Sequence, residues 1–175
     1  WPRDLVMGIG GSLTATRLRH FAARELSTSA SDIDAMVVGT HGEDSVILER
    51  YCRVSGLPLS QFLSSEQLST IFENARTAGT KIVEQAKVAS SFYTPGAAVG
   101  SLVQAFARDS RRVLIASTVL EGEHGVSGRA ASVAVKVGAR GVKQIYELAL
   151  TDDERAAFKR SLDAQEPYAS RLDSE

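Results

Sequence analysis

Cysteine is almost absent from the sequence. The single thiol, Cys52, excludes an internal disulfide and cannot complete a CxxC zinc site. A chain without disulfides is typical of a reducing compartment. We therefore expect a cytoplasmic protein without a bound metal.

The sequence also lacks an excess of either charge and any long apolar run. The 20 basic and 21 acidic residues give a net charge of −1, which supplies no positive field for nucleic acid or an anionic membrane. No apolar stretch approaches the roughly 20 residues of a membrane span, and the first residues, WPRDLVMGIGG, lack the apolar segment of a secretory signal. We expect one globular domain with neither nucleic acid nor membrane as a partner.

Apolar residues at helical spacing mark two segments, and a third, rich in Gly, Ala and Ser, suits a closely packed helix. A capping box formed by Thr151 and Glu154 predicts the start of a fourth helix. Ser12 is expected near the N-cap of the first helix, and Pro95 just ahead of the third. The predicted helices are 13–26, 66–88, 96–109 and 152–164.

Short apolar or alternating runs predict the strands. Residues 46–54 alternate with period two, and a GARG turn follows the fourth predicted strand. The predicted strands are 35–39, 46–54, 112–120, 130–137 and 145–150. Strands and long helices of this kind predict an α+β fold, with antiparallel sheets packed against long helices.

A glycine cluster, Gly8-Ile9-Gly10-Gly11, precedes the first predicted helix. The dinucleotide-binding pattern GxGxxG would require a third glycine where the chain has Leu13, and no strand precedes the cluster. We interpret the cluster as a tight turn before a helix.

His41 follows the buried strand 35–39 and lies between Gly39 and Gly42, which would allow another molecule close to the backbone. An imidazole there could transfer protons near neutral pH, or it could be a structural loop histidine. The run HGED offers no second histidine at metal-ligand spacing. His124, in the turn EGEHG, is interpreted as a loop residue.

Arg17 shares a helical face with Leu13 and Phe21, so that a cation points toward the predicted core. A buried arginine needs an anionic partner. That partner is either a carboxylate ligand held by two parallel hydrogen bonds or an internal ion pair.

Several motifs occur in an order that resembles a known family. They are GGSLTATRLRHFAA, MVVGTHGEDSVIL, RYCRVSGLPLS, SSFYTPGAAV, RRVLIASTVLEGEHG and GARGVKQIYELALTDDERAAF. Together they resemble the C-terminal catalytic domain of the lactate/malate dehydrogenase family, and SSFYTPGAAV resembles its malate branch. The resemblance implies this domain over 1–166 and a polar tail over 167–175.

The resemblance also implies roles for single residues. His41 corresponds to the proton donor and acceptor, Arg17 to the arginine that binds the substrate carboxylate, and Ser90 to a small hydroxyl residue of the substrate pocket. Thr14 stands where the family has the aspartate that pairs with the histidine. A threonine can orient His41 but cannot stabilise an imidazolium by charge, and Glu43 or Asp44 could compensate.

The family's nucleotide-binding half is absent from the chain, which begins at Trp1 rather than Met. The resemblance therefore implies part of an NAD-dependent malate dehydrogenase that acts on malate and oxaloacetate, forms homo-oligomers and is inactive without its other half. Two alternatives are a non-catalytic relative that binds dicarboxylates or associates with other subunits, and a dehydrogenase for another 2-hydroxy acid. The residues that bind the cofactor lie outside these motifs. The motifs therefore do not distinguish NAD from NADP.

Overall fold

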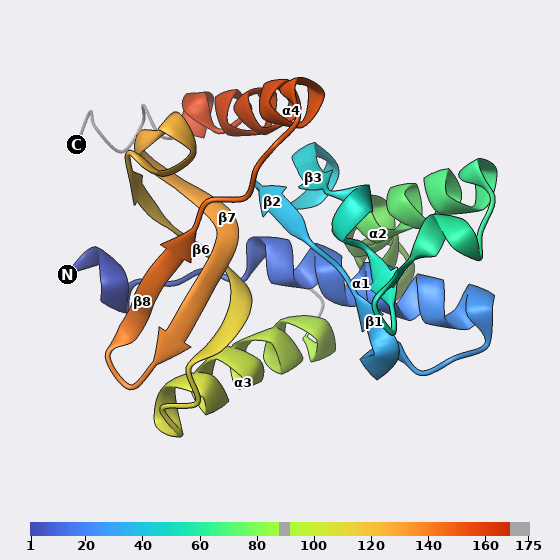
Figure 1. The fold of residues 1–175 in the computed structure, drawn as a ribbon, viewed down its shortest axis with the longest axis horizontal. Helices are drawn as coiled ribbons and strands as arrows, with labels where there is room; N and C mark the ends of the chain where they lie inside the picture. The colour runs from blue at the N-terminus through green and yellow to red at the C-terminus, as the bar shows by residue number, and fades with distance from the viewer. Residues whose placement is uncertain (88–91, 169–175) are drawn as a thin grey trace.

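A computed structural model describes residues 1–87 and 92–168, and its main element is a five-stranded antiparallel sheet (Figure 1). The strands follow the order β3-β2-β7-β6, and β8 pairs with β7 beside β2. Their bounds are β2 Val37–Gly39, β3 Ser45–Ile47, β6 Arg112–Glu121, β7 Ser127–Gly138 and β8 Gly141–Tyr146. A smaller antiparallel sheet contains β1 Ile33–Asp34, β4 Arg53–Val54 and β5 Leu57–Pro58.

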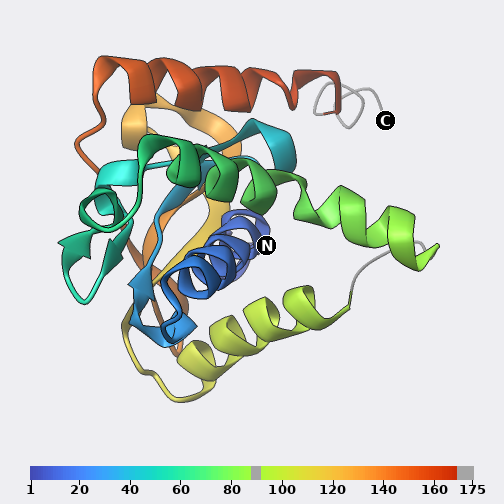
Figure 2. The same ribbon diagram turned by 90° about the vertical axis from the view of Figure 1, so that its right-hand side faces the viewer.

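Four long helices pack around these sheets. They are α1 Gly10–Leu26, α2 Ser65–Ala86, α3 Tyr93–Ala107 and α4 Asp152–Asp163. Helix α1 contacts both α2 and α3 and lies between them, whereas α4 packs on β2 and β3 (Figure 2). The predicted α+β class is confirmed, as is the capping box of α4, in which Thr151 and Glu154 each bond the other's backbone N–H. No helix within the described ranges is long and apolar enough to span a bilayer.

The glycine cluster brings the start of α1 very close to the sheet. Gly8 and Ser117 exchange two backbone hydrogen bonds of 2.8 and 2.9 Å. The Gly11 N–H donates to the Ser132 hydroxyl at 2.8 Å, and a Cβ on Gly11 would lie 2.7 Å from the Ser132 Cβ. The interpretation as a tight turn before a helix is therefore wrong for Gly10 and Gly11, which form the first turn of α1, while Gly8 forms a β-bridge with Ser117, and the cluster serves close packing.

The predicted N-cap at Ser12 is wrong. The helix begins at Gly10 with Ile9 as its N-cap, and the Ser12 hydroxyl instead donates to the Ile115 carbonyl of β6. Pro95, expected ahead of its helix, lies inside the first turn of α3, where its missing N–H leaves no hydrogen bond unmade.

The predicted strand 46–54 is also wrong, because a 3-10 turn over Glu49–Tyr51 divides it into β3 and β4. The buried residues Leu48 and Cys52 on either side of this turn belong to two different hydrophobic clusters. The predicted strand 145–150 is displaced, since β8 covers Gly141–Tyr146 and shares only Ile145 and Tyr146 with it. The long hairpin of β6 and β7 agrees with its prediction.

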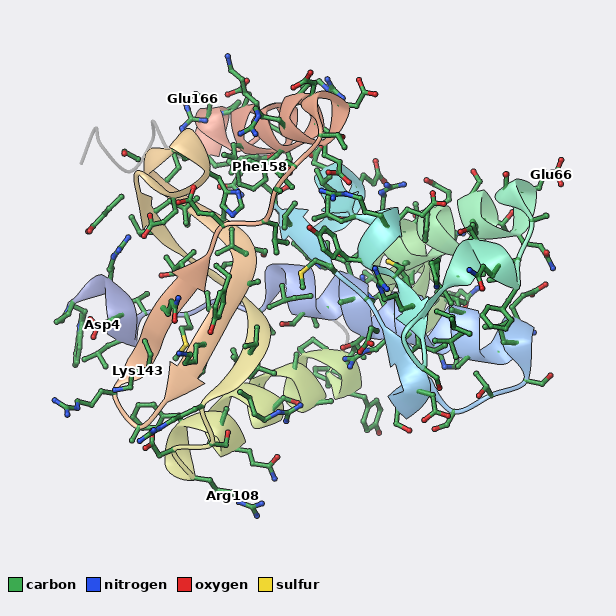
Figure 3. The ribbon with its side chains drawn as sticks, in the orientation of Figure 1. Asp4, Glu66, Arg108, Lys143, Phe158 and Glu166 are labelled. Carbon is green, nitrogen blue, oxygen red and sulfur yellow. The ribbon has the colours of Figure 1, made fainter. Side chains whose placement is uncertain are left out.

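The described part of the chain forms two hydrophobic clusters. Leu18 of α1 and Ile71 of α2 belong to the first. Val133 of β7 and Phe158 of α4 belong to the second, and Figure 3 shows Phe158 beneath α4 on its sheet-facing side. Strand β2 joins them, because Val37 packs in the first cluster and Val38 in the second. The end of β2 is therefore fixed by packing on both of its faces.

His124 is buried in the turn between β6 and β7 and not involved in the polar site described below. Its ring lies 5.5 Å from that of Phe158, and its Nε2 has no hydrogen-bond partner among the described residues. Burial is the main cause that lowers the pKa of His124, and Arg155 lowers it further, while Glu147, the Tyr146 carbonyl and Glu123 raise it.

This burial predicts acid sensitivity of the fold. A histidine whose pKa is lower in the folded than in the unfolded state binds fewer protons when folded, so the free energy of unfolding falls as the pH drops below about 6.5. In His124→Phe the acid-side slope should decrease, by at most about 1.4 kcal/mol per pH unit for one proton. Urea unfolding between pH 5 and 8 measures the slope. An unchanged slope in His124→Phe, with a reduced slope in the control His41→Asn, would assign the effect to His41 instead.

Candidate functional site

One side of α1 carries three residues at helical spacing, and His41 lies against it. Gly10, Thr14 and Arg17 follow one another at i, i+4 and i+7. A Cβ on Gly10 would lie 3.1 Å from the His41 Cβ, and the Thr14 Oγ1 is 3.5 Å from the His41 Nδ1. The first turns of α1 thus place the imidazole beside a threonine hydroxyl.

His41 combines an exposed surface with a partly desolvated ring. Its backbone follows β2 and leads into the 3-10 turn Gly42–Asp44. The residue as a whole is solvent-exposed, but the protein displaces water from one side of the ring. This partial desolvation is the main cause that lowers the pKa of His41. The Arg17 cation lowers this pKa further, and the Gly10 carbonyl raises it. The ring is therefore mainly neutral at neutral pH and can accept a proton.

Arg17 is a buried cation that forms no ion pair with the residues that the structure describes. Only 8% of the residue is exposed, and its Nε and Nη1 have no hydrogen-bond acceptor among the described residues. Both Nη atoms lie 2.9 Å from where a Cβ on Gly79 of α2 would be. Burial lowers the pKa of Arg17. Such a group fits an anionic ligand that supplies the missing acceptors.

Several residues that support this arrangement were not identified from the sequence. Gly79 makes room for Arg17, and its sequence signal is a glycine inside a long helix, where alanine is favoured. Thr40 bonds Ser161 of α4, and Arg76 of α2 donates to the Ser45 carbonyl at 3.1 Å. These contacts join distant segments and have no local sequence signal.

Other candidate residues contribute less. Ser90 lies outside the described residues. Glu43 and Asp44 are exposed, and within the described chain neither forms a hydrogen bond or ion pair with His41. No cluster of three metal-ligating side chains occurs in the parts of the chain that the structure describes.

A separate hollow of about 430 Å³ lies beside a different side of α1, where Ser12, Thr16 and Arg19 line it. Arg53 and Arg112 also line it, whereas His41, Thr14 and Arg17 do not. We place the candidate site at His41 rather than in this hollow, because a titratable imidazole lies there beside buried nitrogen donors that have no acceptor among the described residues.

Comparison with known proteins gives one consistent family. The model of the lactate/malate dehydrogenase alpha/beta C-terminal domain matches residues 12–165. The malate dehydrogenase of Thermomicrobium roseum is 43% identical over 164 residues, which cover 94% of this chain and 53% of that protein. The one from Thermoplasma acidophilum is 36% identical over 172 residues, with 96% and 53% covered. The chain spans about half the length of the curated relatives it matches.

Solved structures agree. The malate dehydrogenase of Salinibacter ruber superposes with a TM-score of 0.95 at 34% identity, covering 99% of this chain and 57% of that one. A lactate dehydrogenase from Eimeria maxima, determined with NADH and oxamate, superposes with a TM-score of 0.94 at 28% identity, covering 99% and 54%. The chain therefore belongs to the lactate/malate dehydrogenase family and has the fold of its alpha/beta C-terminal domain.

Proposed function

We propose that the chain is the catalytic domain of an NAD-dependent malate dehydrogenase, which interconverts malate and oxaloacetate. The observation that carries this proposal is the buried guanidinium of Arg17, whose Nε and Nη1 have no acceptor among the described residues, beside a titratable imidazole along one side of α1. Malate carries a hydroxyl group and two carboxylates, which are the groups that such a pair can bind.

Arg17 would bind one substrate carboxylate. The guanidinium is planar and matches a carboxylate through two parallel hydrogen bonds. The bound anion would supply the acceptors that Nε and Nη1 lack. Binding would also fix the direction in which the substrate hydroxyl points.

His41 would exchange the proton of that hydroxyl. Its lowered pKa favours the neutral ring, which accepts a proton when malate is oxidised and returns it when oxaloacetate is reduced. Thr14 would hold the Nδ1 side of the ring, 3.5 Å away, without the negative charge that stabilises an imidazolium.

The glycine cluster at the start of α1 does not have the form of a dinucleotide site. The Gly8 and Gly11 N–H groups bond Ser117 and Ser132, and no room for a diphosphate remains there. NAD, which accepts the hydride when bound, would be held by residues outside this chain. We therefore expect little NAD binding or turnover by the isolated chain.

A cytoplasmic location and self-association belong to the same proposal. The buried, unpaired thiol of Cys52 supports a reducing environment.

Val99, Val103 and Phe106 of α3 are exposed at i, i+4 and i+7, which supports a packing partner on this helix.

Thr14 favours one alternative, a non-catalytic relative that binds dicarboxylates. To decide, we would fuse the chain behind the nucleotide-binding half of the Salinibacter ruber enzyme and measure NADH oxidation with oxaloacetate and with pyruvate. We expect turnover with oxaloacetate, less with pyruvate, and none in His41→Asn. A fusion protein that binds NADH and oxaloacetate but turns over neither substrate would support the non-catalytic alternative, and faster reduction of pyruvate would indicate another 2-hydroxy acid.

A further inference from the structure

We propose that Ser161 of α4 is a positioning residue for His41, and this inference rests on the proposed role of His41. Among the described residues, Ser161 forms no hydrogen bond with the imidazole or with Arg17. It bonds the residue directly before His41: the Thr40 N–H donates to the Ser161 Oγ at 2.9 Å, and the two hydroxyl oxygens are 3.0 Å apart. Both residues are buried.

The backbone around His41 needs such a support. Gly39 has a φ of +83° and Gly42 a φ of +86°, so left-handed glycines lie on both sides of the Thr40–His41 pair. Glycine has the widest range of backbone conformations, so these two residues do not by themselves restrict the segment between them. Gly39 is held by its pairing with Ser45 and Ser132, and the direction of Thr40 and His41 depends on further hydrogen bonds to neighbouring elements.

The segment is held from two sides. Beyond His41, the Ser45 hydroxyl donates to the Gly42 carbonyl at 2.7 Å, and Arg76 of α2 donates to the Ser45 carbonyl. Before His41, Ser161 binds Thr40 through both its backbone and its side chain. A Cβ on Gly39 would collide with the Ser161 side chain, so α4 packs directly on this turn.

The contact spans 121 residues of sequence, and α4 is well anchored at its far end. The capping box at Thr151 fixes the start of the helix, and Phe158 and Leu162 bury its apolar side. Ser161 thereby transmits the position of a rigid helix to the turn that carries His41. Without it, the 3.5 Å separation between Thr14 and the imidazole would no longer be fixed.

The first test is the titration of His41 in this chain, followed by NMR of the imidazole carbons and nitrogens. In Ser161→Ala we expect the pKa of His41 to rise toward its ordinary value and the ring to lose its tautomer preference, because the ring moves away from Arg17 and the protein surface. Phe158→Leu is the matched control: it loosens the packing of the same helix without removing a bond to Thr40.

Comparison of Ser161→Ala with Phe158→Leu separates a role in positioning His41 from a general effect on the stability of the fold. An unchanged His41 titration in Ser161→Ala, or an equal shift in Phe158→Leu, would overturn the proposal. If Ser161→Ala does not fold, Thr40→Val removes the hydroxyl contact from the other side, and it should shift the titration in the same direction.

The second test uses the fusion enzyme described above. Ser161→Ala should lower kcat with oxaloacetate about 10- to 100-fold while KM changes less than about twofold, since misplacement of a reacting group costs this much. Equal losses of kcat in Phe158→Leu would contradict a positioning role. A fusion protein that is inactive with native Ser161 would refute the proposed activity, whereas the NMR titration would still decide whether Ser161 positions His41.

Discussion

Thr14→Asp should raise kcat of the fusion enzyme by roughly 10² to 10⁴, the factor by which loss of an orienting aspartate slows comparable histidine-dependent sites. Thr14 is fully buried and its hydroxyl lies 3.5 Å from the His41 Nδ1. A carboxylate at this position would accept a hydrogen bond from the ring and stabilise the imidazolium that forms when malate is oxidised. We also expect the pKa of His41 to rise in this variant.

The control for this gain is Thr14→Asn, which has nearly the same shape but no charge. It can orient the ring and should not reproduce the increase in kcat. Steady-state rates at saturating oxaloacetate and NADH, with the pH profile of each variant, separate the two effects. An aspartate variant no faster than the asparagine variant would show that His41 does not depend on a neighbouring negative charge.

Arg17→Met should stabilise the isolated chain, although it removes the proposed ligand-binding group. The guanidinium is buried with two nitrogens unpaired among the described residues, and an unsatisfied buried polar group costs about 1 to 3 kcal/mol, or more when charged. Methionine keeps the apolar stem and removes this penalty. The expected gain in the free energy of unfolding is therefore about 1 to 3 kcal/mol, measured by urea denaturation at pH 7.

A second arginine provides the matched control. Arg76 donates to the Ser45 carbonyl and lies near Glu73, so Arg76→Met removes contacts that exist and should destabilise the chain. Added oxaloacetate should stabilise the native chain and leave Arg17→Met unaffected, because only a folded state with the guanidinium binds the anion. A loss of stability in Arg17→Met would indicate that the guanidinium already has a partner within the protein.

Sequence patterns correctly predicted the elements that are determined by residues close to one another in the sequence. The capping box of Thr151 and Glu154 predicted the start of α4, and the alternating residues of β7 predicted its hairpin with β6. The capping box of α2, formed by Ser64 and Gln67, carried the same signal and was missed. Where a tertiary contact decides, the local pattern misled: the hydroxyl of Ser12 bonds a strand carbonyl instead of capping its helix.

The residues of the candidate site also fall into those that the sequence indicated and those that only the structure shows. Arg17 could be recognised because a cation on an apolar helical face conflicts with its surroundings, and His41 because it ends a buried strand between glycines. Their neighbours, Thr40, Ser161 and Gly79, come from other elements, and no periodicity links them to the site. Sequence thus indicated the groups that carry chemistry and not the contacts that orient them.

The tight packing of Gly11 on Ser132 also determines where the chain can tolerate a change of length. Each residue added to a helix turns everything beyond it by about 100°. An insertion between Gly11 and Thr14 would therefore rotate Thr14 and Arg17 away from His41 while the start of α1 stayed fixed to the sheet. The loop beyond Ser27, by contrast, could lengthen without disturbing this alignment, so variation in length should be confined to the far end of α1.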